Sequence, residues 1–575
     1  MAPPDSALER RVDPRWVLAE RPAPELLEAT RRDLNIPAVM AKILINRNIV
    51  DVEAAKAFLY PSLDYLLDPF LMADMPEAVD RIWAAIQAGE RIMVHGDYDV
   101  DGVTGTALLV RTLEALGADI DFYIPHRLEA GYGISRYGID EGRRRQVKLL
   151  ISVDCGITAV AETAYAQSKG LDIIITDHHQ PSDLPDARAV VNPKRPGCPY
   201  PFKELPGVAL AFKLADAVYR RKAVDLKPVY ENLDLVALGC AADIVPLVGE
   251  NRVLVTCGLA QMQHTQNLGL QALLERLDLK NRRLGTGQLI FVLAPRINAL
   301  GRMGSALDAV TLLTTADAEE ARRIAEVLEH QNQKRRQVDD RMFREALTQV
   351  ETHVDPDRDR AVVLASEDWH PGVIGIVASR IAEKIHLPTV LISVDRERSK
   401  GSGRSIPGFD LYAALAQCQQ HLIAFGGHTY AAGLTIDAKQ IEAFREGFLA
   451  ASAGLITPDV LVPQLYIESE LLLDQVDMRL VEALRRFAPF GAENPRPVMM
   501  SRNVEVVGGI DVVGRNHLKF KARQNGRVLD CIGFNLGHLA YRLSPGEANL
   551  DMAYVIEENE WRGKKEIQLQ IKDLR

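Results

Sequence analysis

Five short apolar segments alternate with helical segments between residues 91 and 193, and this alternation constrains the fold more than any other feature. The apolar segments are RIMVH, DIDFYIP, VKLLISV, LDIIIT and ARAVVNP. Helical patterns such as GVTGTALLVRTLEALGA (102–118) and AVAETAYAQSKG (159–170) separate them. Strands that alternate with helices in this way are typical of a parallel sheet covered by helices. The sequence therefore predicts an α/β domain in this region.

The remaining segments predict how the rest of the chain is organised. Residues 317–351 contain no Gly or Pro, which predicts one long helix between two lobes. Strand and helix patterns from about 359 begin a second α/β lobe, and short strands beyond Pro458, with Gly-Gly and Asn-Gly turns, predict a small barrel. We therefore expect two α/β lobes joined by a helix, plus a C-terminal β-barrel. The expected parts are an N-terminal extension (1–75), a first lobe (76–316), the connecting helix (317–352), a second lobe (353–457) and the barrel (458–575).

Net charge limits the kind of ligand that the chain can bind. The 575 residues include 68 Lys and Arg against 78 Asp and Glu, which gives a formal net charge of −10. This balance excludes a uniformly basic coat for nucleic acid. Basic residues are nevertheless concentrated in 280–302, a segment that contains no Asp or Glu. The charge distribution therefore favours a positive groove in an otherwise acidic body.

Cysteine usage and hydropathy indicate the cellular compartment. The six cysteines are scattered and form no C-x-x-C pair, which is typical of a reducing cytoplasm. The sequence contains no run of 18 apolar residues, so it predicts no membrane span. The first residues do not resemble a secretory signal. We expect a cytoplasmic protein.

Metal-type ligands follow three of the predicted strands, and a fourth candidate ends a helical segment. They are His95, Asp97, Asp99 and Asp101 after the first strand, Asp154 after another, Asp177-His178-His179 after a third, and Asp243 in LGCAADIVPL. The carboxyl ends of neighbouring parallel strands meet at one edge of a sheet, so these side chains are expected to share a crevice. Clustered carboxylates repel one another there, which implies bound cations. Carboxylate and imidazole ligands favour Mn²⁺ or Mg²⁺ over a thiolate-type zinc site.

Two other interpretations of the segment DYDVDG (97–102) remain open at this point. An EF-hand loop matches its first six positions, but the twelfth position is Leu108 instead of Glu, and a strand pattern precedes the loop. A solvated acidic turn explains this segment alone. It does not explain why Asp154 and the Asp-His-His triplet follow two further strands.

The segments DYDVDG, VDCG, TDHH and AADIVPL resemble the four metal-binding motifs of the DHH phosphoesterase superfamily. Within it, the order and spacing of further motifs are most similar to the RecJ family of single-strand-specific 5′→3′ DNA exonucleases. These motifs are GYGISRYG (131–138), PRINALGRMG (295–304), WHPGVIGIVASRI (369–381), GSGRSI (401–406) and FGGHTYAAG (425–433). The resemblance covers about residues 75–455 and implies a DHH lobe followed by a DHHA1 lobe. The C-terminal barrel resembles the oligonucleotide-binding (OB) fold of the same family.

The resemblance implies two bound divalent cations, either Mn²⁺ or Mg²⁺. One ion would be held by Asp101, Asp154, His178 and Asp243. The other would be held by His95 and Asp99, with Asp154 as the bridge, while Asp97 is implied as a ligand or as a neighbour of one. Two such ions activate water and neutralise a phosphodiester. Asp154, His178 and His179 are therefore the implied catalytic residues, with His179 on the scissile phosphate or the leaving oxygen; the alternative for His179 is a packed histidine.

Further residues are implied to bind the substrate. In the DHHA1 motifs, glycines let the backbone approach a phosphate, Arg404 can bind it through two hydrogen bonds, and Ser402, Ser405 and His428 can add contacts. Arg127 and Tyr132 resemble a phosphate contact and a base-stacking residue of the family. Arg296, Asn298 and Arg302 either line the path of the strand or join two lobes by polar bonds. Ordinary turns and packed side chains remain the alternatives for these residues.

A basic segment of the predicted barrel completes the set of candidate residues. Arg515, Lys519, Lys521 and Arg523 outnumber the acidic residues around them, and His517 and Phe520 are interleaved with them. Basic residues alternating with aromatic ones are typical of a surface that binds single strands. A solvated charged β-face is the alternative.

With the resemblance, these features predict a two-metal exonuclease that degrades single-stranded DNA from the 5′ end to 5′-mononucleotides, in repair and recombination. The alternatives are a DHH phosphodiesterase of short oligonucleotides or cyclic dinucleotides, a non-catalytic RecJ-like DNA-binding scaffold, and an inorganic pyrophosphatase. The implied partners are single-stranded DNA, a single-strand-binding protein and a RecQ-type helicase. A monomer associated with the nucleoid is implied as well.

Overall fold

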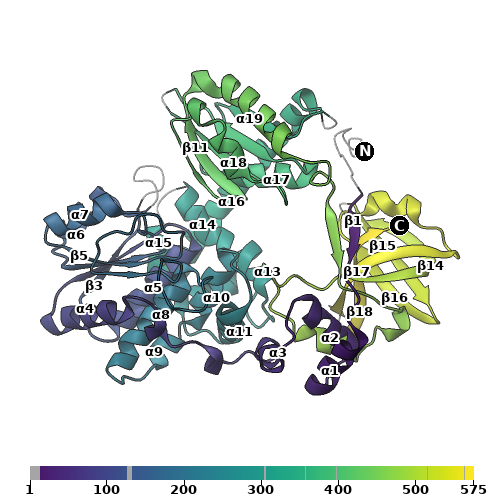
Figure 1. Cartoon of the computed structure of the whole chain (residues 1–575), viewed down its shortest axis with the longest axis horizontal. Helices are drawn as coiled ribbons and strands as arrows, with labels where there is room; N and C mark the ends of the chain where they lie inside the picture. The colour runs from purple at the N-terminus through teal and green to yellow at the C-terminus, as the bar shows by residue number, and fades with distance from the viewer. Residues whose placement is uncertain are drawn as a thin grey trace. The chain divides into compact units, whose positions relative to one another are not determined.

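The computed structural model describes residues 13–125, 133–303, 306–355, 358–396, 398–514, 516–561 and 564–575. The chain forms two compact units. One contains the residues up to Val17 and His330–Tyr466, and the other contains Leu18–Glu329 and Ile467–Arg575. Helix α16 (Ala318–His353) belongs to both, which confirms the single long helix predicted between two lobes (Figure 1). Among the described helices, none combines the length and the apolar character that a membrane span needs.

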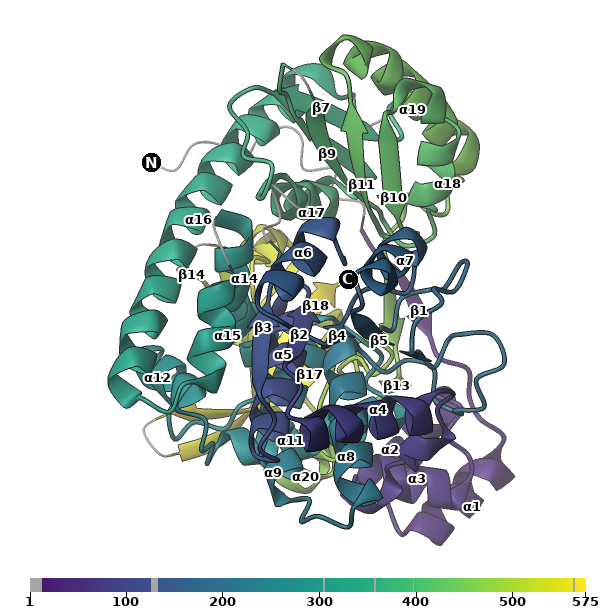
Figure 2. The ribbon, with the colours of Figure 1, turned by 90° about the vertical axis from the view of Figure 1, so that its left-hand side faces the viewer.

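A five-stranded parallel sheet forms the centre of the first α/β lobe (Figure 2). Its strands, in spatial order, are β3 (Ile120–Tyr123), β2 (Ile92–Gly96), β4 (Leu149–Val153), β5 (Asp172–Thr176) and β6 (Ala189–Val191). The chain leaves β2 in one direction to form β3 and returns to the other side to form β4. Such a reversal of strand order opens a crevice at the carboxyl ends of the strands.

Helices cover both faces of this sheet, which explains why its central strands are apolar along their whole length. Ile92, Val94 and Ile151 point into the core that contains α4, α5 and α8. Met93 and Leu150 point to the opposite core, beneath α6 and α7. The covering helices are α4 (Met75–Ala88), α5 (Val100–Glu114), α6 (Arg136–Arg144), α7 (Val160–Ser168) and α8 (Gly207–Arg221). Parallel strands buried on two faces read as continuous apolar runs.

A helical layer extends the first lobe beyond the sheet. It consists of α9 (Lys227–Tyr230), α10 (Leu233–Ala242), α11 (Gly249–Met262), α12 (Leu268–Arg276), α13 (Thr286–Gln288), the π-helix η3 (Leu289–Leu293), α14 (Ala294–Met303) and α15 (Leu307–Thr314). Apolar residues of these helices join the same core as α5 and α8. The elements α13, η3 and α14 follow one another without a break, so Thr286–Met303 forms one helical run.

The second α/β lobe has a mixed sheet of five strands. In spatial order they are β10 (Ala424–Gly427), β11 (Ala431–Ile436), β9 (Ser399–Arg404), β8 (Thr389–Ser393) and β7 (Val362–Ser366). Only β7 and β8 run parallel. The helices of this lobe are α17 (Ile374–Ile385), α18 (Leu411–Ala416) and α19 (Ile441–Leu455).

The C-terminal segment forms a closed sheet. Its strands are β13 (Ser469–Glu470), β14 (Met499–Val513), β15 (His517–Gln524), β16 (Arg527–Gly533), β18 (Lys564–Leu574) and β17 (Ala548–Trp561), and β14 also pairs with β17. The Asn525-Gly526 turn between β15 and β16 has two positive φ angles, as a tight hairpin needs. The predicted class of two α/β lobes with a C-terminal barrel is therefore confirmed.

The barrel shares a core with the N-terminal helices. Helices α1 (Pro24–Leu34), α2 (Ala38–Asn46) and α3 (Val52–Leu59) lie against α20 (Met478–Arg485) and the barrel strands (Figure 1). Met40, Leu44 and Phe58 belong to the same buried cluster as Phe487 and Leu569. The N-terminal extension thus folds with the last part of the chain.

The alternation along β15 corrects one expectation about the barrel surface. Phe520 is only 2% exposed and points into the core, so the prediction that it stacks on bases is wrong. Lys519, Lys521 and Arg523 point to the other face, since side chains alternate along a strand. Arg523 pairs with Glu505 at 2.5 Å, and Lys521 lies 3.7 Å from Asp530, so acidic neighbours offset part of this charge. Arg515 lies outside the described residues.

We predict that Phe520→Ala lowers the free energy of unfolding by about 3–5 kcal/mol, because it empties a buried site. Lys519→Ala, on the exposed face of the same strand, should change this free energy by less than about 0.5 kcal/mol. Urea denaturation followed by circular dichroism measures both. Equal stability of the two variants would contradict the assignment of Phe520 to the core.

Candidate metal centre

The turn from β2 into α5 places three aspartates side by side. Asp99 caps α5, and its carboxylate accepts a hydrogen bond from the Gly102 N–H at 3.1 Å. Asp101 lies in the first turn of the helix. A Cβ on Gly102 would lie 2.6 Å from the Asp97 carbonyl oxygen, so only glycine permits this tight turn. A strand leads into the turn, and this excludes the helix–loop–helix of an EF-hand.

Asp154 follows the neighbouring strand β4 in a left-handed conformation, with φ of 62°. Its N–H donates to the Thr176 carbonyl oxygen of β5 at 3.0 Å, which fixes the turn. The side chain is only 4% exposed. A non-glycine residue in this conformation is strained, and strain of this kind is concentrated at functional sites.

Asp177 follows β5 and holds His179 in position. Its Oδ2 accepts a hydrogen bond from the Ile157 N–H at 2.9 Å. Its Oδ1 accepts from the His179 N–H at 3.1 Å and lies 2.7 Å from His179 Nδ1. Asn192 donates to the His179 carbonyl oxygen at 2.9 Å. The interaction of Asp177 with Nδ1 sets the orientation of the His179 imidazole ring, and Nε2 takes no part in it.

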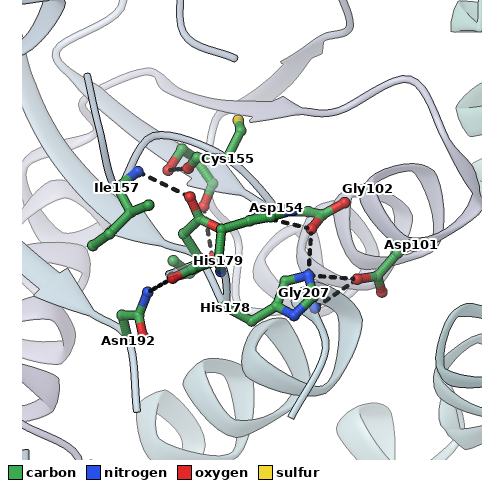
Figure 3. Close-up of polar contacts among 12 residues, drawn as sticks. Asp101, Gly102, Asp154, Cys155, Ile157, His178, His179, Asn192 and Gly207 are labelled. Atoms are coloured by element: carbon green, nitrogen blue, oxygen red, sulfur yellow. Dashed lines mark hydrogen bonds and ion pairs between the residues drawn. The ribbon is translucent and has the colours of Figure 1, made fainter. Parts of the chain in front are cut away.

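His178 lies at the centre of the carboxylates. Its Nε2 is 3.1 Å from Asp154 Oδ1 and 3.8 Å from Asp101 Oδ2 (Figure 3). Asp243 Oδ2 lies 3.7 Å from the same nitrogen. Asp243 is the C-cap residue of α10. Residues from three strand ends and one helix end therefore meet, as the sequence predicted.

The described residues contain three groups of possible metal ligands. Within each group, one ligand atom of every residue lies within 4.8 Å of those of the others. They are Asp97–Asp99–Asp154, Asp101–His178–Asp243 and Asp154–His178–His179. The first two groups have no residue in common. The third group links them, because it contains Asp154 of the first group and His178 of the second. Two neighbouring cation positions with Asp154 between them fit this arrangement.

The electrostatics of the site also fit cations. Burial and the neighbouring Asp99 raise the pKa of Asp101 to about 7. Burial and the charges of Asp101 and Asp99 raise the pKa of Asp154 well above its ordinary value. Partial burial and the same two charges raise the pKa of Asp243. Divalent cations relieve this repulsion, and an all-carboxylate and imidazole donor set suits Mn²⁺ or Mg²⁺.

Helix α8 supplies a contact that sequence reasoning missed. The Gly207 and Val208 N–H groups at its N-terminus donate to the Asp101 carboxylate at 2.6 and 2.8 Å. A Cβ on Gly207 would lie 2.5 Å from the Asp154 Cβ, so this approach requires glycine. The proline before Gly207 marks a helix start in the sequence, but nothing there pairs it with Asp101. Asp177 was missed as a positioning residue, although it stands in the Asp-His-His triplet.

His95 is not brought into any of these ligand groups. It is fully buried at the end of β2, and its Nδ1 lies 3.9 Å from Cys155 Sγ. Its ring packs on Tyr123, with 5.1 Å between centroids, and burial lowers the pKa of His95 to about 4. The structure therefore keeps His95 neutral beside the site, while the carboxylates face one another.

Two of the three residues predicted from PRINALGR lie beside the metal-binding groups. Asn298 and Arg302 of α14 line a cavity of about 320 Å³ together with Asp97 and Asp99. Arg296 is instead buried, and its guanidinium donates to Glu329 of α16 at 2.9 Å. This ion pair joins Arg296 to α16, and a role of Arg296 along the path of the strand stays a prediction.

The predicted residues of the second lobe form a separate group on β9 and the β10–β11 hairpin. Arg404 donates to Ser402 Oγ at 3.0 Å and to Ser379 Oγ at 3.1 Å. A Cβ on Gly375 would lie 2.8 Å from the Arg404 guanidinium. Ser405 Oγ donates to the Phe409 carbonyl oxygen at 2.7 Å, so this hydroxyl stabilises a turn. His428 is exposed next to Gly427.

Arg127 and Tyr132 lie outside the described residues, so their predicted roles stay predictions.

Comparisons with known proteins agree with the motifs. Family models match at residues 91–240 (DHH family, N-terminal domain), 358–451 (DHHA1 domain) and 467–573 (RecJ OB domain). The single-stranded-DNA-specific exonuclease RecJ of Bacillus subtilis is 38% identical over 565 residues, which cover 97% of this chain and 70% of that protein. The RecJ of Escherichia coli is 32% identical over 572 residues, covering 96% of this chain and 98% of that protein.

A crystal structure of RecJ in complex with Mn²⁺ from Thermus thermophilus is similar over 98% of this chain and 79% of that one. The TM-score is 0.84 and the sequence identity 32%. Because the sequence similarities reach 32–38% identity over nearly the whole chain, and all three family models match in order, the chain belongs to the RecJ family of the DHH superfamily.

Proposed function

We propose that this protein is a metal-dependent exonuclease that degrades single-stranded DNA from the 5′ end to 5′-mononucleotides, in DNA repair and recombination. The observation that carries the proposal is the pair of ligand groups linked by Asp154 and His178. A site of this kind suits phosphodiester hydrolysis. The family relatives named as single-stranded-DNA-specific exonucleases support the choice of substrate.

In the proposed site, Asp101, Asp154, His178 and Asp243 hold one cation, and Asp97, Asp99 and Asp154 face the other. His95 stays a proposed ligand of this second ion, because its Nε2 is buried without a hydrogen-bond partner among the described residues. Two Mn²⁺ or Mg²⁺ ions supply charge neutralisation of the phosphate and a nucleophile at neutral pH. RecJ structures that contain Mn²⁺ and Mg²⁺ support this choice of metal.

His179 is the proposed proton donor or phosphate ligand. Although burial alone would lower it, the hydrogen bond to Asp177 raises the pKa of His179 above its ordinary value. A protonated imidazole held through Nδ1 can donate from Nε2 to a phosphate oxygen or to the leaving oxygen. Asp177 keeps this geometry and stays ionised, since the bond to His179 outweighs burial and lowers the pKa of Asp177.

The remaining predicted residues are proposed to bind the strand. Asn298 and Arg302 are suited to the nucleotide nearest the cations, because they line the same cavity as Asp97 and Asp99. Ser402, Arg404, Ser405 and His428 of the second lobe are proposed as phosphate contacts, Arg127 as a further phosphate contact and Tyr132 as a base-stacking residue. A DNA-binding groove on the barrel is proposed as well, and its basic residues are Arg515, Lys519, Lys521 and Arg523. A single-strand-binding protein, a RecQ-type helicase, a monomeric state and association with the nucleoid stay proposals from the family.

Digestion of single strands labelled at either end tests the proposed function. With Mn²⁺, the 5′ label is expected to appear first as a mononucleotide, and duplex DNA should resist. Asp154→Asn should reduce the rate at least about a hundredfold, whereas Asp119→Asn, far from the site at the start of β3, should not. Early release of the 3′ label would refute the polarity, and a preference for dinucleotides would favour a short-oligonucleotide phosphodiesterase. Equal behaviour of wild type and Asp154→Asn would favour a non-catalytic scaffold.

We predict that Asp177→Asn lowers kcat about 10- to 100-fold, because neutral Asn no longer favours the protonated, oriented form of His179. The matched control is Asp172→Asn at the opposite end of β5, whose ion pair with Arg81 is partly exposed. Steady-state kinetics on a labelled single strand measures both, and denaturation checks that both variants fold. Full activity of Asp177→Asn would remove His179 from the mechanism.

We predict that Mn²⁺ binding releases at least one proton and weakens as the pH falls through about 7. The pKa of Asp101 in the metal-free protein is about 7, and only the ionised carboxylate binds a cation. The affinity should fall by about tenfold or more per pH unit well below this value, because Asp154 and Asp243, whose pKa values are also raised, must lose protons as well. Isothermal titration calorimetry in buffers of different ionisation enthalpy measures the proton release. Equal affinity at about pH 6 and pH 8 would contradict the prediction.

A further inference from the structure

The loop that follows α20 contacts two segments that continue to the cavity beside the metal centre. We name residues 486–494 the anchor loop; it belongs to the segment that matches the RecJ OB domain. The loop is held in shape from within. Asn494 donates to the carbonyl oxygens of Phe487 and Pro489 at 2.8 and 2.7 Å, and Gly491 and Asn494 exchange two backbone hydrogen bonds.

Arg252 of α11 fixes the anchor loop to the first α/β lobe. Its guanidinium donates to the carbonyl oxygens of Arg486, Phe487 and Ala488 at 2.8–2.9 Å, and to that of Phe58 at 2.7 Å. The side chain is 1% exposed, and burial lowers the pKa of Arg252 to about 9. The carbonyl groups at the end of α20 favour a cation because the helix dipole is negative there. The loop is therefore docked by a buried, multiply bonded contact.

One side of the anchor loop meets the turn that carries Asp243. The Leu247 N–H donates to the Ala492 carbonyl oxygen at 2.9 Å. A Cβ on Gly491 would lie 2.6 Å from Leu247 Cδ1, so the Leu247 side chain packs closely on the Gly491 backbone. Leu247 follows Asp243 by four residues, in the short turn between α10 and α11. Ala242, at the start of this turn, lines the cavity beside Asp97 and Asp99.

The other side of the anchor loop meets the helical run that carries Asn298 and Arg302. Thr286 begins this run, and its hydroxyl donates to the Phe490 carbonyl oxygen at 2.6 Å. Thr286 is 7% exposed. The run continues without a break to α14, where Asn298, Gly301 and Arg302 line the same cavity as Ala242.

We propose that the anchor loop positions the metal centre, so that the barrel segment supports catalysis as well as strand binding. Thr286 and Leu247 are the two connections: the helical run of Thr286 continues to Asn298 and Arg302, and the turn of Leu247 follows Ala242, all of which line one cavity. Thr286 is a positioning residue, since it acts through α14 and touches neither substrate nor metal. The inference rests on the proposed function for its kinetic part, whereas its effect on metal binding can be measured without any substrate.

Thr286→Val tests the proposal in the full-length chain, because it removes the hydroxyl and keeps the shape. We expect Mn²⁺ to bind about five- to tenfold more weakly, as the loss of one buried hydrogen bond would give. Electron paramagnetic resonance of free Mn²⁺ during a titration measures this. In kinetics on a long single strand, kcat should fall by a similar factor, and KM should rise because the same helical run carries Asn298 and Arg302. Thr286→Ser keeps the hydroxyl and should restore both values.

Ser501→Ala is the matched control. It removes a buried hydrogen bond of the barrel interior, to the Leu471 carbonyl oxygen at 2.7 Å, without touching the anchor loop. It should lower stability and leave Mn²⁺ affinity unchanged. Unchanged Mn²⁺ affinity in Thr286→Val would overturn the proposal. An equal loss in Thr286→Ser or in Ser501→Ala would overturn it too, because the effect would then come from bulk or from general destabilisation. If the wild type binds Mn²⁺ but releases no nucleotide, the proposed function fails while the titration still decides the coupling.

Discussion

Mutual repulsion among desolvated carboxylates is the constraint on which the first lobe depends. Asp101 and Asp154 are almost completely buried, and burial together with the charges of neighbouring aspartates raises the pKa of each. A chain can hold such a group together only on a rigid support. The support here is a parallel sheet with an apolar core on either face. The strain at Asp154 is tolerated because β4 and β5 fix the backbone on both sides.

Backbone dipoles supply part of the compensation that side chains cannot. The N-terminus of α8 donates two hydrogen bonds to Asp101, and the Gly102 N–H donates to Asp99. Partial positive charge at a helix N-terminus stabilises a nearby carboxylate. Glycine at positions 102 and 207 is required because a Cβ would collide with Asp97 or Asp154. These contacts reduce the repulsion, and cations that bind the remaining oxygens complete the balance.

The barrel is joined to this lobe through a shared structural unit. N-terminal helices and barrel strands bury one common cluster, and Arg252 connects both to α11.

The acidic net charge of the chain is compatible with DNA binding because acidic and basic side chains lie in different places. Several of the acidic residues lie in the metal centre, while Asn298 and Arg302 face it from α14. Charge that is averaged over the whole chain hides this separation.

The sequence by itself determined the fold class, the long helix and the meeting of Asp154, His178 and Asp243. Strand-end ligands are predictable because the alternating pattern gives a parallel sheet, and parallel strands end at one edge. Only the tertiary structure decided which of several residues in the same segment are buried and which face the cavity or solvent. Arg296 is buried against Glu329 while Arg302 lines the cavity, and Phe520 packs inward while Lys519 faces solvent. The contacts of Gly207 with Asp101 and of Thr286 with Phe490 join residues about a hundred or more positions apart. Local patterns hold no information about such pairs, since packing between distant elements brings them together.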